Sequence, residues 1–230
     1  MPLFDIICLA NSTKLSGRCV AGLRTDGEGW MRPIAPGPTG ELHDGQYTFA
    51  DITEPALLDI VRIEVMERRP SPYQPENWLL GSRIWELVQR PAPAEFAPLI
   101  ASQLIRGPAL LGNTAASVSL ESFTANPAGA SLALVAPSQI QWRVYPSENT
   151  KRVRVHFNLG ASPYGLPVTD PKYVDRLKQF PIGLHQSAEI GIPPAAKLLF
   201  TVSLSEPFNG ACYKLVAAIV ILPQSWSRYF

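Results

Sequence analysis

The sequence lacks a long hydrophobic run, a cysteine framework and a secretory leader. Its longest apolar run, residues 215–222, has 8 residues, whereas a membrane-spanning helix needs about 20. The three cysteines, Cys8, Cys19 and Cys212, are odd in number and form no CxxC motif, which disfavours a disulfide scaffold and is typical of a reducing compartment. No basic segment followed by a sustained apolar run opens the chain. We therefore expect a soluble, cytoplasmic protein with no membrane partner.

An excess of charge of either sign is also missing. The chain has 20 Lys and Arg against 19 Asp and Glu, for a formal net charge of +1. Proteins that bind nucleic acid mainly by neutralising phosphates usually carry a basic excess. Any nucleic-acid binding here must therefore depend on a local basic patch, and not on the field of the whole protein.

Catalytic motifs are absent as well. The sequence contains no GxxxxGK[ST], GxGxxG or GxSxG string. The three histidines, His43, His156 and His185, are far apart and lack the spacing of a zinc site. We expect no enzymatic activity, no metal and no cofactor.

The residues that are present indicate short β-strands and many turns. The 23 prolines and 16 glycines are dispersed along the chain, which disfavours long helices. Residues 4–10 form an apolar run, typical of a buried strand. Residues 11–17 then read as a polar loop, 20–24 as a second strand, 25–29 as a turn and 30–34 as the returning strand.

The second half alternates between apolar and polar residues. In 140–145 and 152–157 every second residue is apolar, so one face of each strand should be buried. Arg152, Arg154 and His156 fall on the outward face, with a hairpin turn at 146–150 between the two strands. Two short helices are predicted, one beginning near Pro98 and one at Pro171 with Asp170 as its N-cap.

A stretch of small and turn-forming residues, 125–129, is the best candidate for a domain boundary. It divides the chain into residues 1–125 and 126–230, each with a β pattern. Both halves also contain a strand, a polar loop and a Gly-x-Cys string that leads into a further strand, at 9–19 and 204–212. This weak repetition favours two related β domains.

With these strings in view, the sequence resembles the dual OB-fold family. The likeness is carried by ICLANSTKLSGRCVAGL (7–23), GWMRPI (29–34), PYGLPVTDP (163–171) and VSLSEPFNGACYKLVAAIV (202–220), whereas 37–130 matches no known pattern. The resemblance implies a mainly β fold of two tandem OB-like Greek-key barrels, one in each half, with one or two short helices. It implies nucleic-acid binding only by analogy with other OB-folds, and no catalytic residues.

OB barrels bind single strands by stacking bases on aromatic rings and laying the backbone along basic residues. On that basis ten residues are candidates for contacting nucleic acid: Lys14, Arg18, Arg24, Trp30, Arg32, Arg143, Arg152, Arg154, Tyr213 and Lys214.

These candidates fall into two constellations and two extensions. Arg24, Trp30 and Arg32 flank one hairpin, although Trp30 in the core with solvated arginines is the alternative. Arg143, Arg152 and Arg154 share an outward sheet face with His156, although an ordinary solvent-exposed face without a ligand is the alternative. Lys14 with Arg18, and Tyr213 with Lys214, would extend these surfaces.

Two functions stay open. The first is a non-catalytic module that binds single-stranded RNA or DNA through arginine and aromatic contacts. The alternative is a module that binds a protein partner or a small nucleotide-like ligand, which the near-neutral charge favours.

Overall fold

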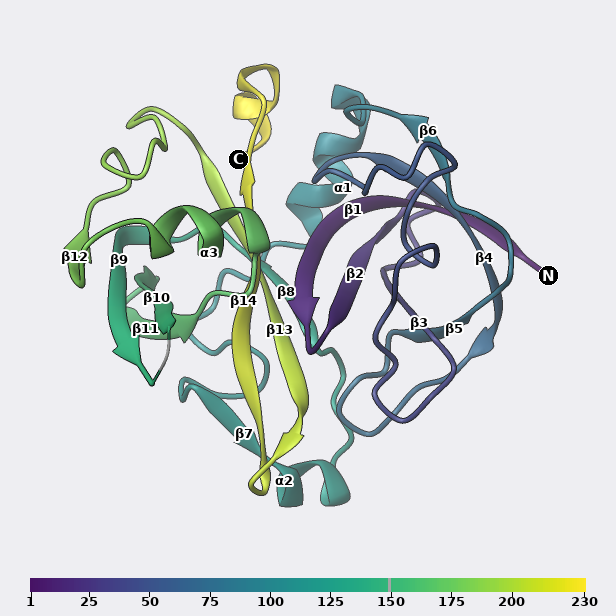
Figure 1. The fold of residues 1–230 in the computed structure, drawn as a ribbon, viewed down its shortest axis with the longest axis horizontal. Helices are drawn as coiled ribbons and strands as arrows, with labels where there is room; N and C mark the ends of the chain where they lie inside the picture. Colours follow the sequence, from purple (N-terminus) through teal and green to yellow (C-terminus); the bar gives the residue numbers. More distant parts are fainter. Residues whose placement is uncertain (149) are drawn as a thin grey trace.

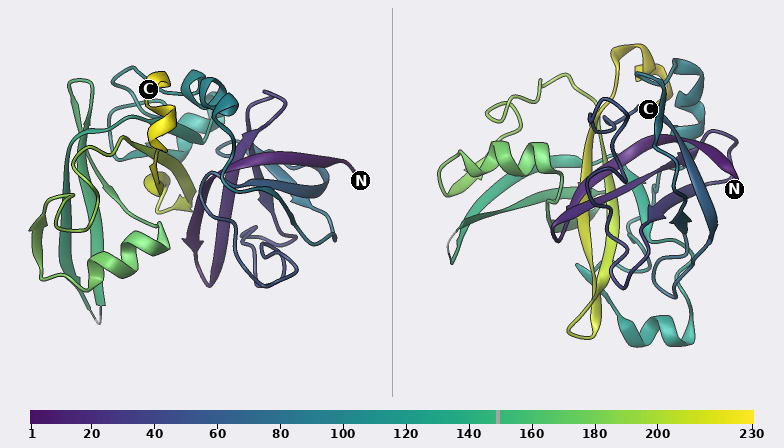
Figure 2. Two further views of the ribbon diagram at one scale, coloured as in Figure 1. Left: turned by 90° about the horizontal axis from the view of Figure 1, so that it is seen from above. Right: turned by 45° about the vertical axis from the view of Figure 1, so that its right-hand side comes forward.

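Most of the regular secondary structure is β-strand, and the strands form two barrels side by side (Figure 1). The computed structural model describes residues 1–148 and 150–230. The N-terminal barrel occupies one lobe and the C-terminal barrel the other, with the β13–β14 hairpin running between them (Figure 2). The mainly β, dual-barrel architecture confirms the fold that the resemblance implies.

The first barrel is closed. Its strands are β1 (Leu3–Lys14), β2 (Gly17–Arg24), β3 (Trp30–Ile34), β4 (Ile60–Arg68), β5 (Asn77–Leu80) and the edge strand β6 (Glu86–Gln89). They are ordered β1-β2-β3-β5-β4, and β4 returns to pair with β1. Only β3 and β5 are parallel. Between β3 and β4 no helix forms in the described chain; instead Leu42, Tyr47 and Phe49 fill the core.

The second barrel has the same strand order but is only partly closed. Its strands are β7 (Ser117–Ser119), β8 (Leu132–Val135), β9 (Ser138–Ser147), β10 (Thr150–Leu159), β11 (Ser162–Pro167), β12 (Gly183–His185), β13 (Leu198–Phe208) and β14 (Ala211–Ile221). β8 and β9 act as one strand bent at Pro137, because β8 pairs with β13 and β9 with β10. β11 reaches β14 through a single parallel bridge, Val168↔Val216.

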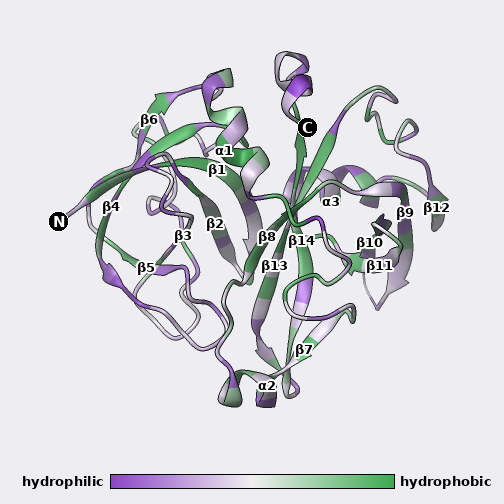
Figure 3. Cartoon of the chain, turned by 180° about the vertical axis from the view of Figure 1, so that it is seen from behind, coloured by the Kyte–Doolittle hydropathy of each residue, from purple (hydrophilic) through white to green (hydrophobic). Residues whose placement is uncertain are grey.

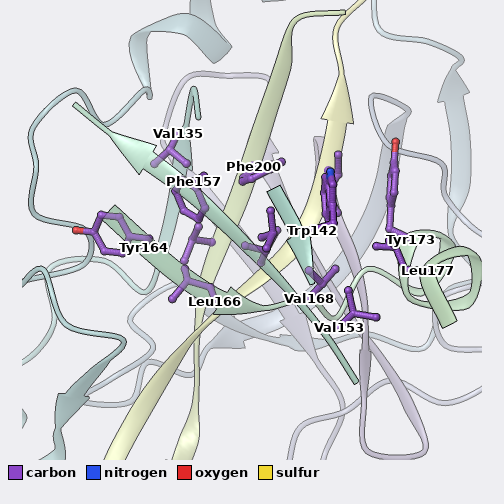
Figure 4. Packing of buried hydrophobic residues seen from close by; sticks show 14 of the residues in the cluster. Val135, Trp142, Val153, Phe157, Tyr164, Leu166, Val168, Tyr173, Leu177 and Phe200 are labelled. Carbon is purple, nitrogen blue, oxygen red and sulfur yellow. The ribbon is translucent and has the colours of Figure 1, made fainter. Parts of the chain in front are cut away.

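Aromatic rings fill the second core (Figure 4). The Trp142 ring meets Phe200 edge-on at 6.0 Å and stacks on Tyr173 at 5.9 Å. Phe157 stacks on Tyr164 at 5.6 Å. Trp142 points inward from β9 and Phe157 points inward from β10. Because successive side chains of a strand point to opposite faces, the neighbours of these two residues along each strand point outward.

The helices are short: α1 (Ala97–Ser102), α2 (Leu120–Ala125), α3 (Pro171–Lys178) and the 3₁₀ turns η1 (Ala94–Phe96) and η2 (Gln224–Tyr229). α3 begins as predicted, because Asp170 Oδ1 accepts the backbone N–H of Tyr173. The other oxygen of Asp170 accepts the N–H of Ile219, which ties the helix to β14. None of the helices in the described residues is long and apolar enough to cross a bilayer.

The two barrels meet through the outward face of β1 and β2. Ile7, Leu9 and Leu23 on that face pack against Leu199 and Val220 of β13 and β14. Because the opposite face of β1 fills its own barrel, β1 is buried on both sides. The hydrophobic colouring concentrates where β1, β8, β13 and β14 come together (Figure 3).

Three details differ from, or lie beyond, the sequence-based expectations. Residues 11–14, predicted as loop, continue β1 as far as Lys14, because they pair with β2 up to Lys14↔Gly17. The turn predicted at 146–150 includes residue 149, which lies outside the described residues. The division at 125/126 stays a prediction; β7, which precedes it, pairs with β14 of the second barrel.

Candidate functional site

A row of basic side chains lies on the outward face of β9 and β10. Arg154 stands directly opposite Arg143 in the ladder, and Arg152 stands opposite Tyr145. His156 follows on the same side, between Gln141 on β9 and Gly165 on β11. We call Arg143, Tyr145, Arg152, Arg154 and His156 the basic face.

The arginines of the basic face are not neutralised by carboxylates. In the described chain no Asp or Glu oxygen lies within 4.0 Å of Arg143, Arg152 or Arg154. Arg154 Nη1 donates one hydrogen bond, to the carbonyl of Gly165 at 2.7 Å. Like charges directly opposite one another destabilise a sheet. Because no carboxylate in the described chain offsets this repulsion, the positive charge of the three arginines is available to bind an anion.

The pKa of His156 reflects its burial and the positive charges beside it. Burial lowers its pKa from 6.5, and the neighbouring Arg143 and Arg154 lower it further. Its Nε2 is buried and has no hydrogen-bond partner among the described atoms. The imidazole lies against Gly165, where an added Cβ would come within 3.0 Å of the ring. Gly165 thus makes room for the imidazole on the sheet surface.

The first-barrel constellation is placed differently. The Arg32 side chain is fully buried between the barrels, where Nη2 donates to Ser203 Oγ at 3.0 Å and Nη1 to Asn77 Oδ1 at 3.4 Å. Arg24 pairs with Asp26 and lies 4.2 Å over the Phe4 ring. Trp30 is half-buried and packs against the apolar contact between the barrels.

Lys14 and Arg18 are each engaged by a carboxylate. Lys14 Nζ lies 3.0 Å from Glu206 Oε1, an ion pair that joins the two barrels. Arg18 forms a two-pronged pair with Glu54, and the hydrogen bond to Glu54 raises the pKa of Arg18. An anionic ligand would compete with these carboxylates for both side chains.

Tyr213 and Lys214 point to opposite sides of β14. Tyr213 is exposed near the hairpin tip, beside Phe208. Lys214 is fully buried, and its ammonium donates to the Asn113 carbonyl (2.7 Å), Asn113 Oδ1 (2.8 Å) and the Ala115 carbonyl (2.7 Å). Burial lowers the pKa of Lys214 to about 8. The structure thus brings Arg143, Arg152 and Arg154 together and separates the other seven candidates from them.

Tyr145 was not among the candidates, although it is the one aromatic ring on the basic face in the described chain. Its signal was present in the sequence, because the alternation of 140–145 places it on the same side as Arg143. Among the described residues, no group of three or more His, Cys, Asp or Glu side chains could hold a metal ion.

Comparison with solved structures gives one match over the whole chain, a murine DNA-binding protein bound to double-stranded DNA. The identity is 8%, the match covers 96% of this chain and 99% of the other, and the TM-score is 0.32. A likeness this distant carries no argument about function. None of the curated proteins compared with the chain matches it.

The family comparison is decisive because it covers nearly the whole chain. Residues 4–219, which run from β1 to β14 and span both barrels, match the dual OB-containing domain. Domains built from OB-folds are typically binding modules. The chain belongs to the dual OB-containing domain family.

Proposed function

We propose that the basic face of the second barrel binds single-stranded nucleic acid. The observation that carries this proposal is the pair Arg143 and Arg154, which stand opposite each other on an outward sheet face without a carboxylate partner in the described chain. Guanidinium groups bind phosphate oxygens through paired N–H donors. Since the net charge is only +1, such a local cluster is the feature that binding needs.

The place of the cluster in the fold supports the same function. OB-folds bind oligonucleotides on the face formed by their second and third strands. In the second barrel these strands are β10, which carries Arg152, Arg154 and His156, and β11, which carries Gly165. Tyr145 and the arginine planes offer surfaces on which unpaired bases stack. A duplex hides its base faces, so these surfaces favour a single strand.

The first prediction is a salt-dependent affinity that is lost with the arginines. Fluorescence anisotropy with labelled oligo(dT) and oligo(rU) over a salt series should show binding that weakens as salt rises. With three phosphate contacts the slope of log K against log[salt] should be about −2, since each contact on a single strand contributes about −0.7. The double variant Arg143→Gln/Arg154→Gln should reduce the slope to about −0.7 and the affinity at low salt by about tenfold or more.

The control is Arg62→Gln, which removes one positive charge from a surface strand of the first barrel, where Arg62 pairs with Asp5. It should leave both affinity and slope unchanged. Equal losses in Arg62→Gln and in Arg154→Gln would mean that only net charge matters. Wild-type protein without affinity at low salt would contradict the proposal outright.

A further inference from the structure

A cavity of about 440 Å³ lies between the two barrels, away from the basic face. The tip of the β1–β2 hairpin forms one wall, through residues such as Leu15 and Cys19, and the β13–β14 hairpin forms the other. Small-molecule sites commonly have volumes of about 300–1,000 Å³ and lie preferentially between domains. The size and the location of this cavity both match that class.

Most of the surface that lines the cavity is apolar, although polar residues also contribute carbon atoms to it. Leu204, Leu215 and Ala217 line the cavity from the second barrel. At its edge, Leu15 is 72% exposed and Phe208 is 66% exposed, each at the tip of its hairpin. Exposing two large apolar side chains to water beside one opening raises the free energy of the empty protein. They would recover it by contacting a flat apolar surface.

The charged residues that line the cavity form an ion pair that crosses from one barrel to the other. Lys14 Nζ and Glu206 Oε1 are 3.0 Å apart, and their side chains are 15% and 34% exposed. The pair presents a donor and an acceptor next to each other. A ligand with a net charge would separate them and leave one half-buried charge without a partner. A neutral ligand with an acceptor beside a donor can bind both and leave the pair together.

The strand that carries Glu206 also brings a buried positive charge close to the cavity. Ser203 lines the cavity and accepts a hydrogen bond from the fully buried Arg32 behind it. Arg32 Nε has no partner, and no carboxylate lies within 4.0 Å of its guanidinium in the described chain. The positive charge behind Ser203 stabilises oxygen lone pairs in the cavity.

We propose that this inter-barrel cavity binds a neutral, flat heterocycle with a ring carbonyl next to a ring N–H, the edge presented by uracil or hypoxanthine. The carbonyl would accept from Lys14 and the N–H would donate to Glu206, with the ring between the apolar walls. The site does not depend on the proposed nucleic-acid function, because none of the residues of the basic face lines it.

The test is isothermal titration calorimetry of the full chain with uridine, inosine and 3-methyluridine. Methylation at N3 removes the N–H and leaves the rest of the base unchanged. Uridine or inosine should bind, and 3-methyluridine should bind at least tenfold more weakly than uridine. Orotate, a uracil that carries a carboxylate, should bind more weakly than uracil.

Two variants locate the binding. Leu215→Trp fills the cavity from a half-buried position and should weaken uridine binding at least tenfold. Should that variant fail to fold, Lys14→Met/Glu206→Met removes the ion pair and both of its hydrogen-bonding groups with side chains of similar size and should make uridine and 3-methyluridine equivalent. Arg154→Gln, on the basic face, should leave uridine binding unchanged.

Failure is distinguishable from failure of the nucleic-acid proposal. Equal affinity for uridine and 3-methyluridine in the wild-type protein, or no heat from uridine or inosine at millimolar concentration, overturns the cavity assignment. Uridine binding that is lost in Arg154→Gln and retained in Leu215→Trp would move the ligand to the basic face and overturn it as well.

Discussion

The equivalent outward faces of the two barrels differ in their side chains and in what covers them. In the first barrel the outward side of β1 and β2 carries Ile7, Leu9 and Leu23, and the second barrel covers it. In the second barrel the outward side of β9 and β10 carries Arg143 and Arg154, and solvent covers it. The strand order is shared, so topology alone does not determine which surface is free to bind. The side chains on the outward positions do.

The arginines of the first constellation also differ from those of the basic face in their partners. Arg32 lies between the barrels with neutral partners, while Arg18 and Arg24 are paired with Glu54 and Asp26. Each of these guanidinium groups contributes to the structure of the first barrel or to its contact with the second. In the described chain, Arg143, Arg152 and Arg154 are arginines that a ligand could bind without displacing a carboxylate.

The largest expected effect comes from placing an arginine on the apolar outward face of the first barrel. Leu9→Arg would place a guanidinium in the apolar contact between the barrels, where Leu9 is fully buried. We expect the free energy of unfolding to fall by about 4 kcal/mol or more, because a buried charge without a partner is among the most destabilising changes. Urea denaturation followed by tryptophan fluorescence measures this change.

The matched variant is Gln141→Arg, which adds a guanidinium to the half-exposed row beside His156. Its free energy of unfolding should stay within about 0.5 kcal/mol of wild type, and its affinity for oligonucleotides should rise. Similar stability losses in both variants would show that the two faces are not distinguished by burial.

Much of this contrast between the two faces could be predicted from the sequence. Residues 6–10 are apolar without alternation, the pattern of a strand covered on both faces, and β1 is covered on both faces. Residues 152–157 alternate, and the structure confirms that Arg152, Arg154 and His156 point outward.

Other features could not be predicted from local pattern. The burial of Arg32 depends on Ser203, 171 residues away, and that of Lys214 on carbonyl groups about 100 residues before it. The strand β5 has only four residues and begins two residues after Pro75, so no period is long enough to detect. Side chains whose partners come from distant segments are determined by tertiary packing, which a single sequence does not display.

The buried cations sharpen the comparison, because the first barrel holds an arginine and the second a lysine. Arginine is not deprotonated in proteins, whereas burial lowers the pKa of Lys214 to about 8 from 10.5. Between these two values the unfolded chain holds a proton that the folded protein has released. The free energy of unfolding should therefore rise as pH increases through this range, by up to about 3 kcal/mol in total.

Lys214→Met should lack that rise, as measured by urea denaturation at several pH values from 7 to 10.5. Lys172→Met, on the exposed start of α3, controls for the loss of one lysine charge. If wild type and Lys214→Met gained stability in parallel with pH, the ammonium of Lys214 would not be the group that titrates.

The smallest expected effect is a pKa change on the basic face itself. The pKa of His156 lies below 6.5 because of burial and then because of Arg143 and Arg154. Arg154→Gln should raise this pKa in an NMR titration, whereas Arg62→Gln on the first barrel should not. A bound phosphate chain should raise it as well, because negative charge stabilises the imidazolium.

The same shift links His156 to folding. Its folded pKa is below that of the unfolded chain, so the unfolded state binds more protons as pH falls below 6.5, and the protein should lose stability there. His156→Gln should remove this part of the acid sensitivity. If Arg154→Gln left the His156 pKa unchanged, the guanidinium and the imidazole would not share one field, and the basic face would be a set of separate side chains instead of a single anion-binding surface.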